Sequence, residues 1–113
     1  MNKDDAYLLD MLYAVQAITQ IIKDRDRVAL DEDIQMQSAV YWQPCVLGEA
    51  ANALSDVFRD NHDSIPWYGI IGLRNRLIHG YQAIDNDIIW DVLQNQMPSL
   101  LSRLQIIAGE IGH

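Results

Sequence analysis

The stretch Gly72-Leu73-Arg74-Asn75-Arg76-Leu77-Ile78-His79-Gly80-Tyr81 combines a helical apolar pattern with the densest group of chemically competent side chains in the chain. Its leucines recur at helical spacing, and glycine is the residue type that most often ends a helix. The surrounding segment, Ser64–Ile84, contains no acidic residue, although an even distribution of 16 acids over 113 residues would put about three there. The stretch therefore predicts a helix end with a local positive field inside an acidic protein.

The composition predicts one globular domain covering residues 1–113. Half of the residues are apolar and 21% are charged, which is typical of a packed fold. The net charge of −8 argues against a protein that coats nucleic acid, because such proteins neutralise many phosphates with lysine and arginine. Any nucleic-acid chemistry must therefore be confined to a small site.

The single cysteine, Cys45, allows no intramolecular disulfide and no cysteine-based metal cluster, and it favours a reducing, cytoplasmic compartment. His62 and His113 have no neighbours at metal-ligand spacing, so no metal site is predicted. The N-terminus has no signal-peptide pattern, and no apolar run approaches transmembrane length.

Apolar residues at helical spacing predict a first helix over about residues 4–23, followed by a charged loop. A second helical pattern runs from Asp33 to about Asp60, and the acids at 31–33 suit its N-terminus. Pro44 interrupts this pattern by removing a backbone donor. We expect either a kinked helix or two helices that meet near Tyr41–Pro44.

A short helix is expected between Pro66, which suits a first turn, and Gly80. A loop over residues 81–87 and a last helix over residues 88–111 follow, with Pro98 kinking or dividing that helix. No convincing strand pattern occurs. The sequence thus predicts an all-α fold in which four main helices, with one or two breaks, pack as an antiparallel bundle.

The motif stretch has the residue types that metal-free RNA cleavage requires. Asn75 and His79 lie four apart and share a helical face, whereas Arg74 lies about 140° around the helix from His79. Arg74 and His79 can therefore converge only at the helix end or across a partner subunit. A base must take the 2′-hydroxyl proton, an acid must protonate the leaving oxygen, and a cation must stabilise the phosphorane. One histidine supplies one acid–base group at a time, whereas a two-fold dimer supplies two. The alternative is structural, a histidine that caps a helix and arginines in surface ion pairs.

The segment Arg74–Tyr81 resembles the Arg-x4-His-x-Tyr motif of the HEPN superfamily, specifically its HepT-like toxin branch. Gly48-Glu49-Ala50-Ala51, Ile65-Pro66-Trp67, and Ile84-Asp85 with Ile89-Trp90 extend the resemblance over most of the chain. It implies an all-α, homodimeric, metal-independent endoribonuclease toxin that needs no cofactor. It also implies a partner, a minimal nucleotidyltransferase antitoxin that silences the toxin by attaching AMP to the motif tyrosine.

Carried over by position, the resemblance assigns Arg74 to the scissile phosphate and His79 to proton transfer. Asn75 would hold the site in register, and Tyr81 would be the residue that receives AMP. Arg76 is interpreted either as a second phosphate contact or as an ion-pair residue. An AMP group at Tyr81 would bring a phosphate and a bulky base beside the site's cations, in competition with RNA.

Glu49 falls on or beside an apolar helix face, so it is predicted to be partly buried and paired with Arg74 or Arg76. An ion pair that fixes the motif helix is the favoured interpretation, and direct catalysis is the alternative. Tyr41 and Trp42 are assigned either to the core or to the dimer surface.

Trp67 and Trp90 are predicted to be core or interface anchors rather than base-stacking platforms. Cys45 is predicted to be a small buried hydrophobe. Two other functions remain open for the chain as a whole. One is a non-catalytic module that docks a nucleotidyltransferase and presents its substrate, and the other is a purely structural helical dimer.

Overall fold

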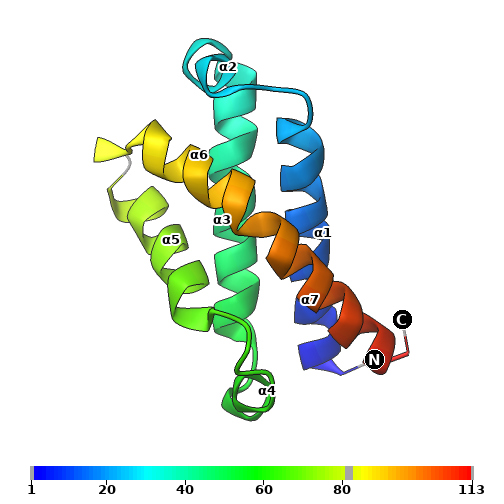
Figure 1. Ribbon diagram of the computed structural model, residues 1–113. Helices are drawn as coiled ribbons and strands as arrows, with labels where there is room; N and C mark the ends of the chain where they lie inside the picture. Colours follow the sequence, from blue (N-terminus) through cyan, green and yellow to red (C-terminus); the bar gives the residue numbers. More distant parts are fainter. Residues whose placement is uncertain (1, 81–82, 113) are drawn as a thin grey trace.

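The computed structural model describes residues 2–80 and 83–112, and all the regular secondary structure in these ranges is α-helical apart from one residue of 3₁₀ helix at Ala83. The helices follow one another along the chain (Figure 1) as α1 (Lys3–Ile22), α2 (Arg27–Glu32), α3 (Ile34–Ala53), α4 (Asp56–Asn61), α5 (Trp67–His79), α6 (Asn86–Asn95) and α7 (Met97–Glu110). The predicted fold class, all-α and bundle-like, is confirmed. None of these helices is both long and apolar enough to cross a lipid bilayer.

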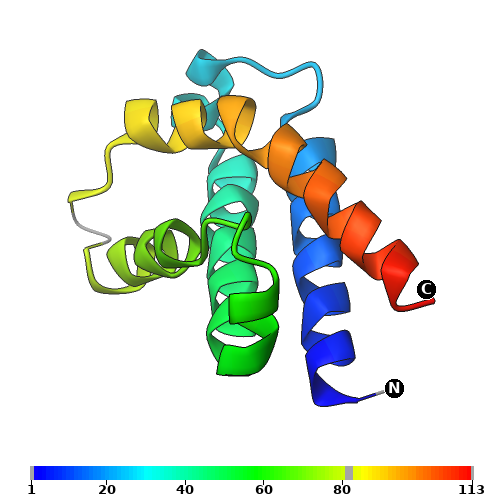
Figure 2. The same cartoon turned by 60° about the horizontal axis from the view of Figure 1, so that its bottom comes forward.

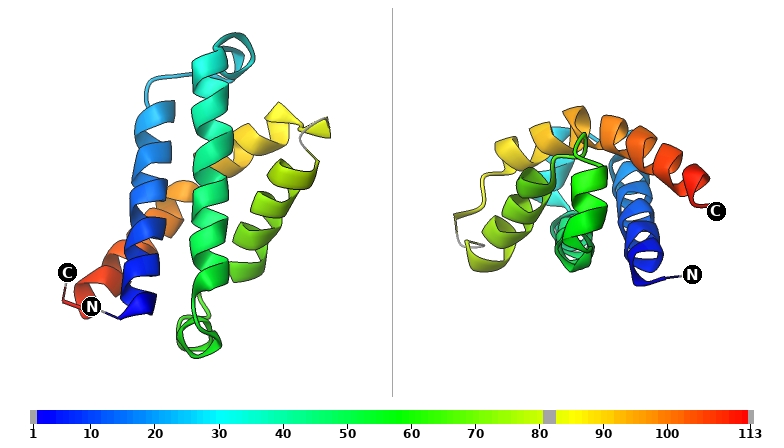
Figure 3. Two further views of the ribbon diagram at one scale, coloured as in Figure 1. Left: turned by 180° about the vertical axis from the view of Figure 1, so that it is seen from behind. Right: turned by 90° about the horizontal axis from the view of Figure 1, so that it is seen from below.

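Three helices form a layer, and the last two helices cross one side of it. Helices α1, α3 and α5 lie side by side with alternating direction (Figure 1). Helices α6 and α7 run end to end across this layer (Figure 2), and α7 packs on α1. The opposite side of the layer is left uncovered by other helices (Figure 3). This uncovered side is called the open face below.

The core lies between the layer and the crossing helices. In α1 the buried residues recur every three or four positions, as expected for an amphipathic helix. Asn2 caps α1 by accepting a hydrogen bond from the backbone N–H of Asp5 at 2.8 Å. The side chains that are buried most completely are Leu8, Met11, Val15, Ile18, Leu30, Val40, Leu47, Ile65, Leu93 and Leu104.

Of the two alternatives for the second helix, a kink or a division near Pro44, the division is wrong. Helix α3 continues through Pro44, which is buried. The chain breaks instead at Leu54, ten residues later and well before the predicted end at Asp60. Ser55 explains the position of the break, because its Oγ accepts a hydrogen bond from the N–H of Phe58 at 3.1 Å and so caps α4. Asp4 of α1 accepts hydrogen bonds from both the N–H and the Oγ of Ser55, at 2.9 and 2.7 Å.

The sequence analysis missed helix α2, which occupies part of the predicted loop. Asp26 caps it through a 2.9 Å hydrogen bond from the N–H of Ala29, and Leu30 anchors it in the core. Asp33 then caps α3, as the acidic run predicted, by accepting hydrogen bonds from Gln35 and Met36. Helix α2 has only six residues, fewer than two helical turns, so its sequence shows no repeating apolar pattern.

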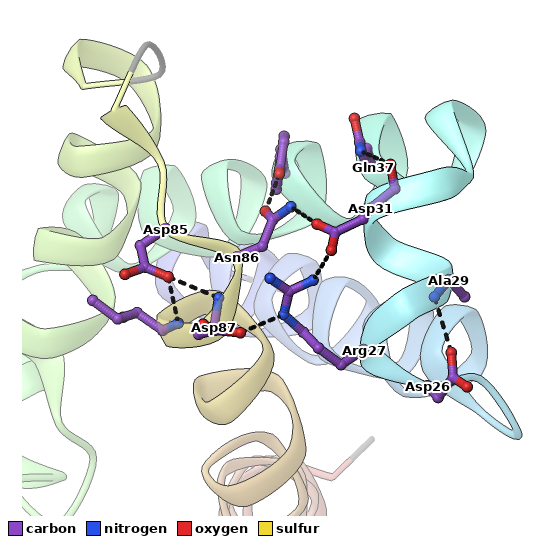
Figure 4. Close-up of polar contacts among 10 residues, drawn as sticks. Asp26, Arg27, Ala29, Asp31, Gln37, Asp85, Asn86 and Asp87 are labelled. Atoms are coloured by element: carbon purple, nitrogen blue, oxygen red, sulfur yellow. Dashed lines mark hydrogen bonds and ion pairs between the residues drawn. The ribbon is translucent and has the colours of Figure 1, made fainter.

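A polar network joins α2 and α3 to the start of α6 (Figure 4). Arg27 contacts Asp31 and Asp87, each at 2.7 Å. Asn86 donates to Asp31 at 2.9 Å and accepts a hydrogen bond from the hydroxyl of Tyr41. The hydrogen bond from Asn86 and the contact with Arg27 lower the pKa of Asp31. The network fixes the N-terminus of α6 against the layer.

The expected division of the last helix near Pro98 is confirmed. Helix α6 ends at Asn95, and α7 begins at Met97 with Pro98 in its first turn, where a missing N–H costs least. Helix α6 begins two residues earlier than predicted, because Asp85 caps it by accepting hydrogen bonds from Asp87 and Ile88.

Candidate functional site

Helix α5 carries Arg74, Asn75, Arg76 and His79 and is anchored at its start. At its start, the Trp67 Nε1–H donates to the backbone oxygens of Arg59 at 3.1 Å and His62 at 3.0 Å. Trp67 is also buried, so its predicted role as an anchor is confirmed. At its end, the N–H of Gly80 donates to the carbonyl of Arg76 at 2.8 Å, as the predicted helix end requires.

The motif helix touches α3 at a glycine. A Cβ placed on Gly48 would lie 2.3 Å from the Cβ and 2.8 Å from the Cγ of Arg74, much closer than two carbon atoms can approach. Only glycine therefore allows the two helices to meet at this distance. The aliphatic stem of Arg74 therefore packs directly on α3, and this packing is independent of the polar contacts of the guanidinium.

The guanidinium of Arg74 has a partner on each side. Its Nη2 forms an ion pair with the Oε1 of Glu49, and its Nη1 donates to the Oδ1 of Asn75 at 2.6 Å. The Arg74 side chain is 23% exposed and that of Glu49 is 57% exposed. The predicted pairing of Glu49 is thus observed, but the prediction that Glu49 is partly buried is wrong. The ion pair gives the Glu49 carboxylate a partner at the surface, where it is also open to water.

The remaining motif residues lie at the exposed end of the helix. His79 is the last residue of α5 and is exposed, one helical turn beyond Asn75. Arg76 is also exposed and makes no ion pair within the described part of the chain. It borders a hollow of about 280 Å³ together with Gly80 and Asp85. Tyr81, the predicted AMP acceptor, lies outside the described residues.

The open face contains a groove next to Arg74. This groove has a volume of about 780 Å³ and is lined by α1, α3 and α5. Trp42, which is 64% exposed, lies in it, and so do Glu49 and Ile78. Tyr41 lines the same groove and is half-buried. Of the two alternatives for Trp42, core or surface, the structure therefore selects the surface.

Cys45 also lines the groove and is half-buried, packed against the core. Burial raises the pKa of its thiol, and the Sγ–H donates to the Tyr41 carbonyl at 3.2 Å. Both effects favour the thiol over the reactive thiolate, in agreement with the predicted packing role. Trp90 is likewise half-buried and packs against the core.

Comparison with known proteins places this site in a family. The sequence profile described as Ribonuclease HepT-like matches residues 11–107. The chain belongs to the HepT-like ribonuclease family. The resemblance inferred from the Arg74–Tyr81 motif is confirmed, and the protein is an endoribonuclease of this family.

Individual relatives agree with this assignment. Two proteins of Methanocaldococcus jannaschii, whose names include the word RNase, are similar to the chain. One is 33% identical over 98% of this chain and 93% of its own length, and the other is 29% identical over 95% and 100%. A Thermococcus cleftensis protein named a probable ribonuclease HepT is 26% identical over 88% of this chain and 90% of its own length. No solved structure matches the chain significantly.

The sequence analysis did not identify two residues of the site's surroundings. Gly48 was noted only in the segment Gly48-Glu49-Ala50-Ala51 that extends the family resemblance, and its contact with Arg74 was not predicted. Trp42 was left between core and surface, because an apolar residue that faces a partner has the same pattern as one in the core.

Among residues 2–80 and 83–112, no three His, Cys, Asp or Glu side chains converge as metal ligands.

Proposed function

We propose that the protein is the ribonuclease toxin of a toxin–antitoxin pair and that it cleaves RNA at Arg74 and His79 without a metal ion. The observation that carries this proposal is the guanidinium of Arg74, held by Glu49 and Asn75, on the same helix whose last residue is the exposed His79. A planar guanidinium suits two phosphate oxygens and the charge that develops on them. An imidazole accepts and returns protons near neutral pH.

The proposed reaction is a transesterification within the RNA strand. The 2′-oxygen passes its proton to a general base of the site and attacks phosphorus, and the bond from phosphorus to the 5′-oxygen breaks. His79 donates a proton to the leaving 5′-oxygen. Arg74 binds the non-bridging oxygens, and Asn75 holds the guanidinium in position. The products are a 2′,3′-cyclic phosphate and a free 5′-hydroxyl.

The active form is proposed to be a homodimer that pairs the open faces. Trp42 is a large, exposed apolar side chain in a groove, a combination that marks contact surfaces rather than ordinary solvated surface. Ile78, the neighbour of His79, lines the same groove. A two-fold contact here would bring two copies of Arg74 and His79 towards one cleft. RNA would bind between the protomers, away from the acidic outer surface.

Tyr81 is proposed as the off-switch. It lies two residues beyond His79, and a nucleotidyltransferase partner would attach AMP to its phenolic oxygen. The added phosphate is an anion that competes with RNA for Arg74 and Arg76. Arg76 supports this proposal, because it is exposed and carries a permanent charge at the same helix end.

The catalytic assignment is tested by incubating purified protein with RNA in EDTA. Wild-type protein should cleave, and both His79→Ala and Arg74→Ala should reduce the rate by about 10²–10⁴-fold. His62→Ala is the matched control, because it removes an imidazole that packs on Phe58. Cleavage by His79→Ala at the wild-type rate would contradict the proposal. Lack of cleavage by wild-type protein that still binds its partner would favour the substrate-presenting module.

The switch is tested by co-expression with a minimal nucleotidyltransferase of the kind proposed as the antitoxin. Intact mass should increase in steps of one AMP, and the modified protein should not cleave RNA. Tyr81→Phe should stay unmodified and active. Tyr68→Phe is the control, because Tyr68 is 95% exposed but lies near the start of α5. Modification of Tyr81→Phe to the same extent would disprove the assigned position.

A further inference from the structure

The proposed reaction leaves one charged group at the site unused. Glu49 lies on α3 directly after Gly48, contacts the Nη2 of Arg74, and keeps 57% of its side chain exposed to solvent. It lines the groove of the open face together with Ile78, the residue before His79. A carboxylate in direct contact with the phosphate-binding cation lies within reach of any substrate that this cation holds.

We propose that Glu49 is the general base that takes the 2′-hydroxyl proton. This inference rests on the proposed ribonuclease function. It assigns the two proton transfers to two different groups of one chain, Glu49 for the nucleophile and His79 for the leaving oxygen. Each protomer then contains a full acid–base pair, and the dimer serves to shape the cleft.

The positions of the two groups fit an in-line displacement. The attacking and leaving oxygens lie on opposite sides of phosphorus, so base and acid must flank the phosphate. Glu49 approaches Arg74 from α3, and Asn75 contacts Arg74 from the other side. His79 follows Asn75 on the same face of α5, about 5–6 Å away between Cβ atoms. The proposal therefore places the carboxylate on one side of a phosphate held by Arg74, and it requires the exposed imidazole at the end of α5 to reach the other side.

Substrate binding itself would activate the base. Before RNA arrives, the carboxylate of Glu49 is engaged in its ion pair with Arg74. An incoming phosphate competes for the same guanidinium nitrogen and displaces the carboxylate. The freed carboxylate then lies beside a negative phosphate and without its cation, and both changes favour proton uptake. The proton moves from the 2′-oxygen to Glu49 as the bond from that oxygen to phosphorus forms.

The charges around Glu49 are compatible with this role. Asp10 and Tyr7 of α1 and Cys45 of α3 line the same groove, and Arg74 is the cation paired with Glu49. Asp10→Asn is therefore a useful control, because it changes the local charge without removing the proposed base.

A purely structural role for Glu49 predicts different kinetics. If the carboxylate only positions Arg74, then Glu49→Gln, which keeps an oxygen for the guanidinium, should leave kcat nearly unchanged and affect mainly KM. If Glu49 is the base, kcat should fall by about 10²–10⁴-fold with little change in KM. The acidic limb of the wild-type pH–rate profile should also be absent in Glu49→Gln, and Glu49→Asp should retain it.

The decisive experiment uses an oligoribonucleotide with a bridging 5′-sulfur at the cleavage site mapped for wild-type protein. A thiolate leaves without protonation, so this substrate no longer requires the acid. His79→Ala should then cleave within about tenfold of wild type, whereas Glu49→Gln should remain about 10²–10⁴-fold slower on both substrates. Asp10→Asn should cleave both at rates close to wild type.

Two results would overturn the role of Glu49. One is a Glu49→Gln variant with a wild-type kcat and an unchanged acidic limb. The other is rescue of Glu49→Gln by the sulfur substrate, which would make this residue the acid. Thermal melting of each variant shows whether it is folded. Failure of the ribonuclease function itself is a separate outcome, since wild-type protein would then cleave neither substrate.

Discussion

The Cα of Gly48 is in direct contact with the aliphatic stem of Arg74. Helices α3 and α5 therefore meet without an intervening side chain at the point where the Arg74 side chain leaves α5. A methyl group at position 48 would overlap two carbons of Arg74 and lie 3.3 Å from the Ile70 carbonyl. The backbone carbonyl cannot yield as a flexible side-chain end can. Fold and site therefore depend on the same few atoms.

The first prediction concerns this contact. Gly48→Ala should lower the free energy of unfolding by about 1–3 kcal/mol through overpacking, and it should reduce RNA cleavage because Arg74 is displaced from Asn75. Urea unfolding and initial cleavage rates measure the two effects. Gly72→Ala is the matched control, because no atom lies within 4 Å of its added Cβ. This control should be more stable by up to about 1 kcal/mol, as expected for a helical glycine. Equal free energies of unfolding and equal cleavage rates for Gly48→Ala and Gly72→Ala would show that the contact between Gly48 and Arg74 leaves room for a methyl group.

The second prediction concerns the anchor of α5. Trp67→Phe should destabilise the fold by about 1–3 kcal/mol, because it removes the donor to the carbonyls of Arg59 and His62 and leaves a smaller ring in the core. Trp90→Phe should cost less, since the Trp90 indole makes no hydrogen bond to another described residue. Thermal unfolding of the two variants provides the comparison. A larger loss for Trp90→Phe would refute the anchor role.

The third prediction concerns acid stability. The hydrogen bonds from the Oγ and N–H of Ser55 lower the pKa of Asp4 below its ordinary value of 3.8. The carboxyl therefore holds its proton less tightly in the folded chain than in the unfolded chain. Its contribution to stability is complete above a pH of about 4 and disappears as the pH falls through the lowered pKa. Asp4→Asn should lose stability near neutral pH and should differ less from wild type in strong acid.

The control for this experiment is Asp5→Asn, because Asp5 is next to Asp4 in α1 and its carboxyl makes no hydrogen bond to a described residue. Urea titrations of wild type and both variants at neutral pH and in strong acid give the free energies of unfolding to be compared. A constant difference between Asp4→Asn and wild type across this range would show that the Ser55 contact does not depend on the charge.

The fourth prediction concerns self-association. Trp42→Asp should dissociate the proposed dimer without unfolding the protomer, because Trp42 lies on the open face and is largely exposed. Light scattering coupled to size exclusion measures the mass, and circular dichroism measures the fold. Tyr68→Asp is the control, since Tyr68 lines a separate hollow between α4 and α5. If Tyr68→Asp dissociated the dimer and Trp42→Asp did not, the interface would lie on the surface around Tyr68 and not on the open face.

The sequence predicted the long amphipathic helices well because burial imposes a period that residues such as Leu8 and Leu104 display directly. It misplaced the break in the second helix, since Pro44 is a visible helix breaker and Leu54 is not. A proline within a long helix is tolerated when tertiary packing compensates for the lost donor. The actual break depends on Ser55 and Asp4, which are 51 residues apart, and such a pairing leaves no local signal.

The placement of three candidate site residues on one helix followed from the sequence, whereas their catalytic roles stay predictions. Arg74, Asn75 and His79 lie within one helix, so their relative positions follow from spacing alone. The pairing of Glu49 followed from the rule that a carboxylate on an apolar face needs a partner. The exposure of Glu49 was not predicted. The residues of the open face form an apolar pattern in the sequence, yet this face is uncovered in the protomer.

Helix α5 rests mainly on α3, and the contact between Gly48 and Arg74 is where the two backbones come closest. His79 lies five residues further along, about 7.5 Å down the axis. The stem of Arg74 is therefore held at its contact with Gly48, whereas His79 lies beyond this contact at the exposed end of the helix. In the proposed mechanism, a tilt of α5 about Gly48 would displace the proton donor more than the phosphate-binding cation.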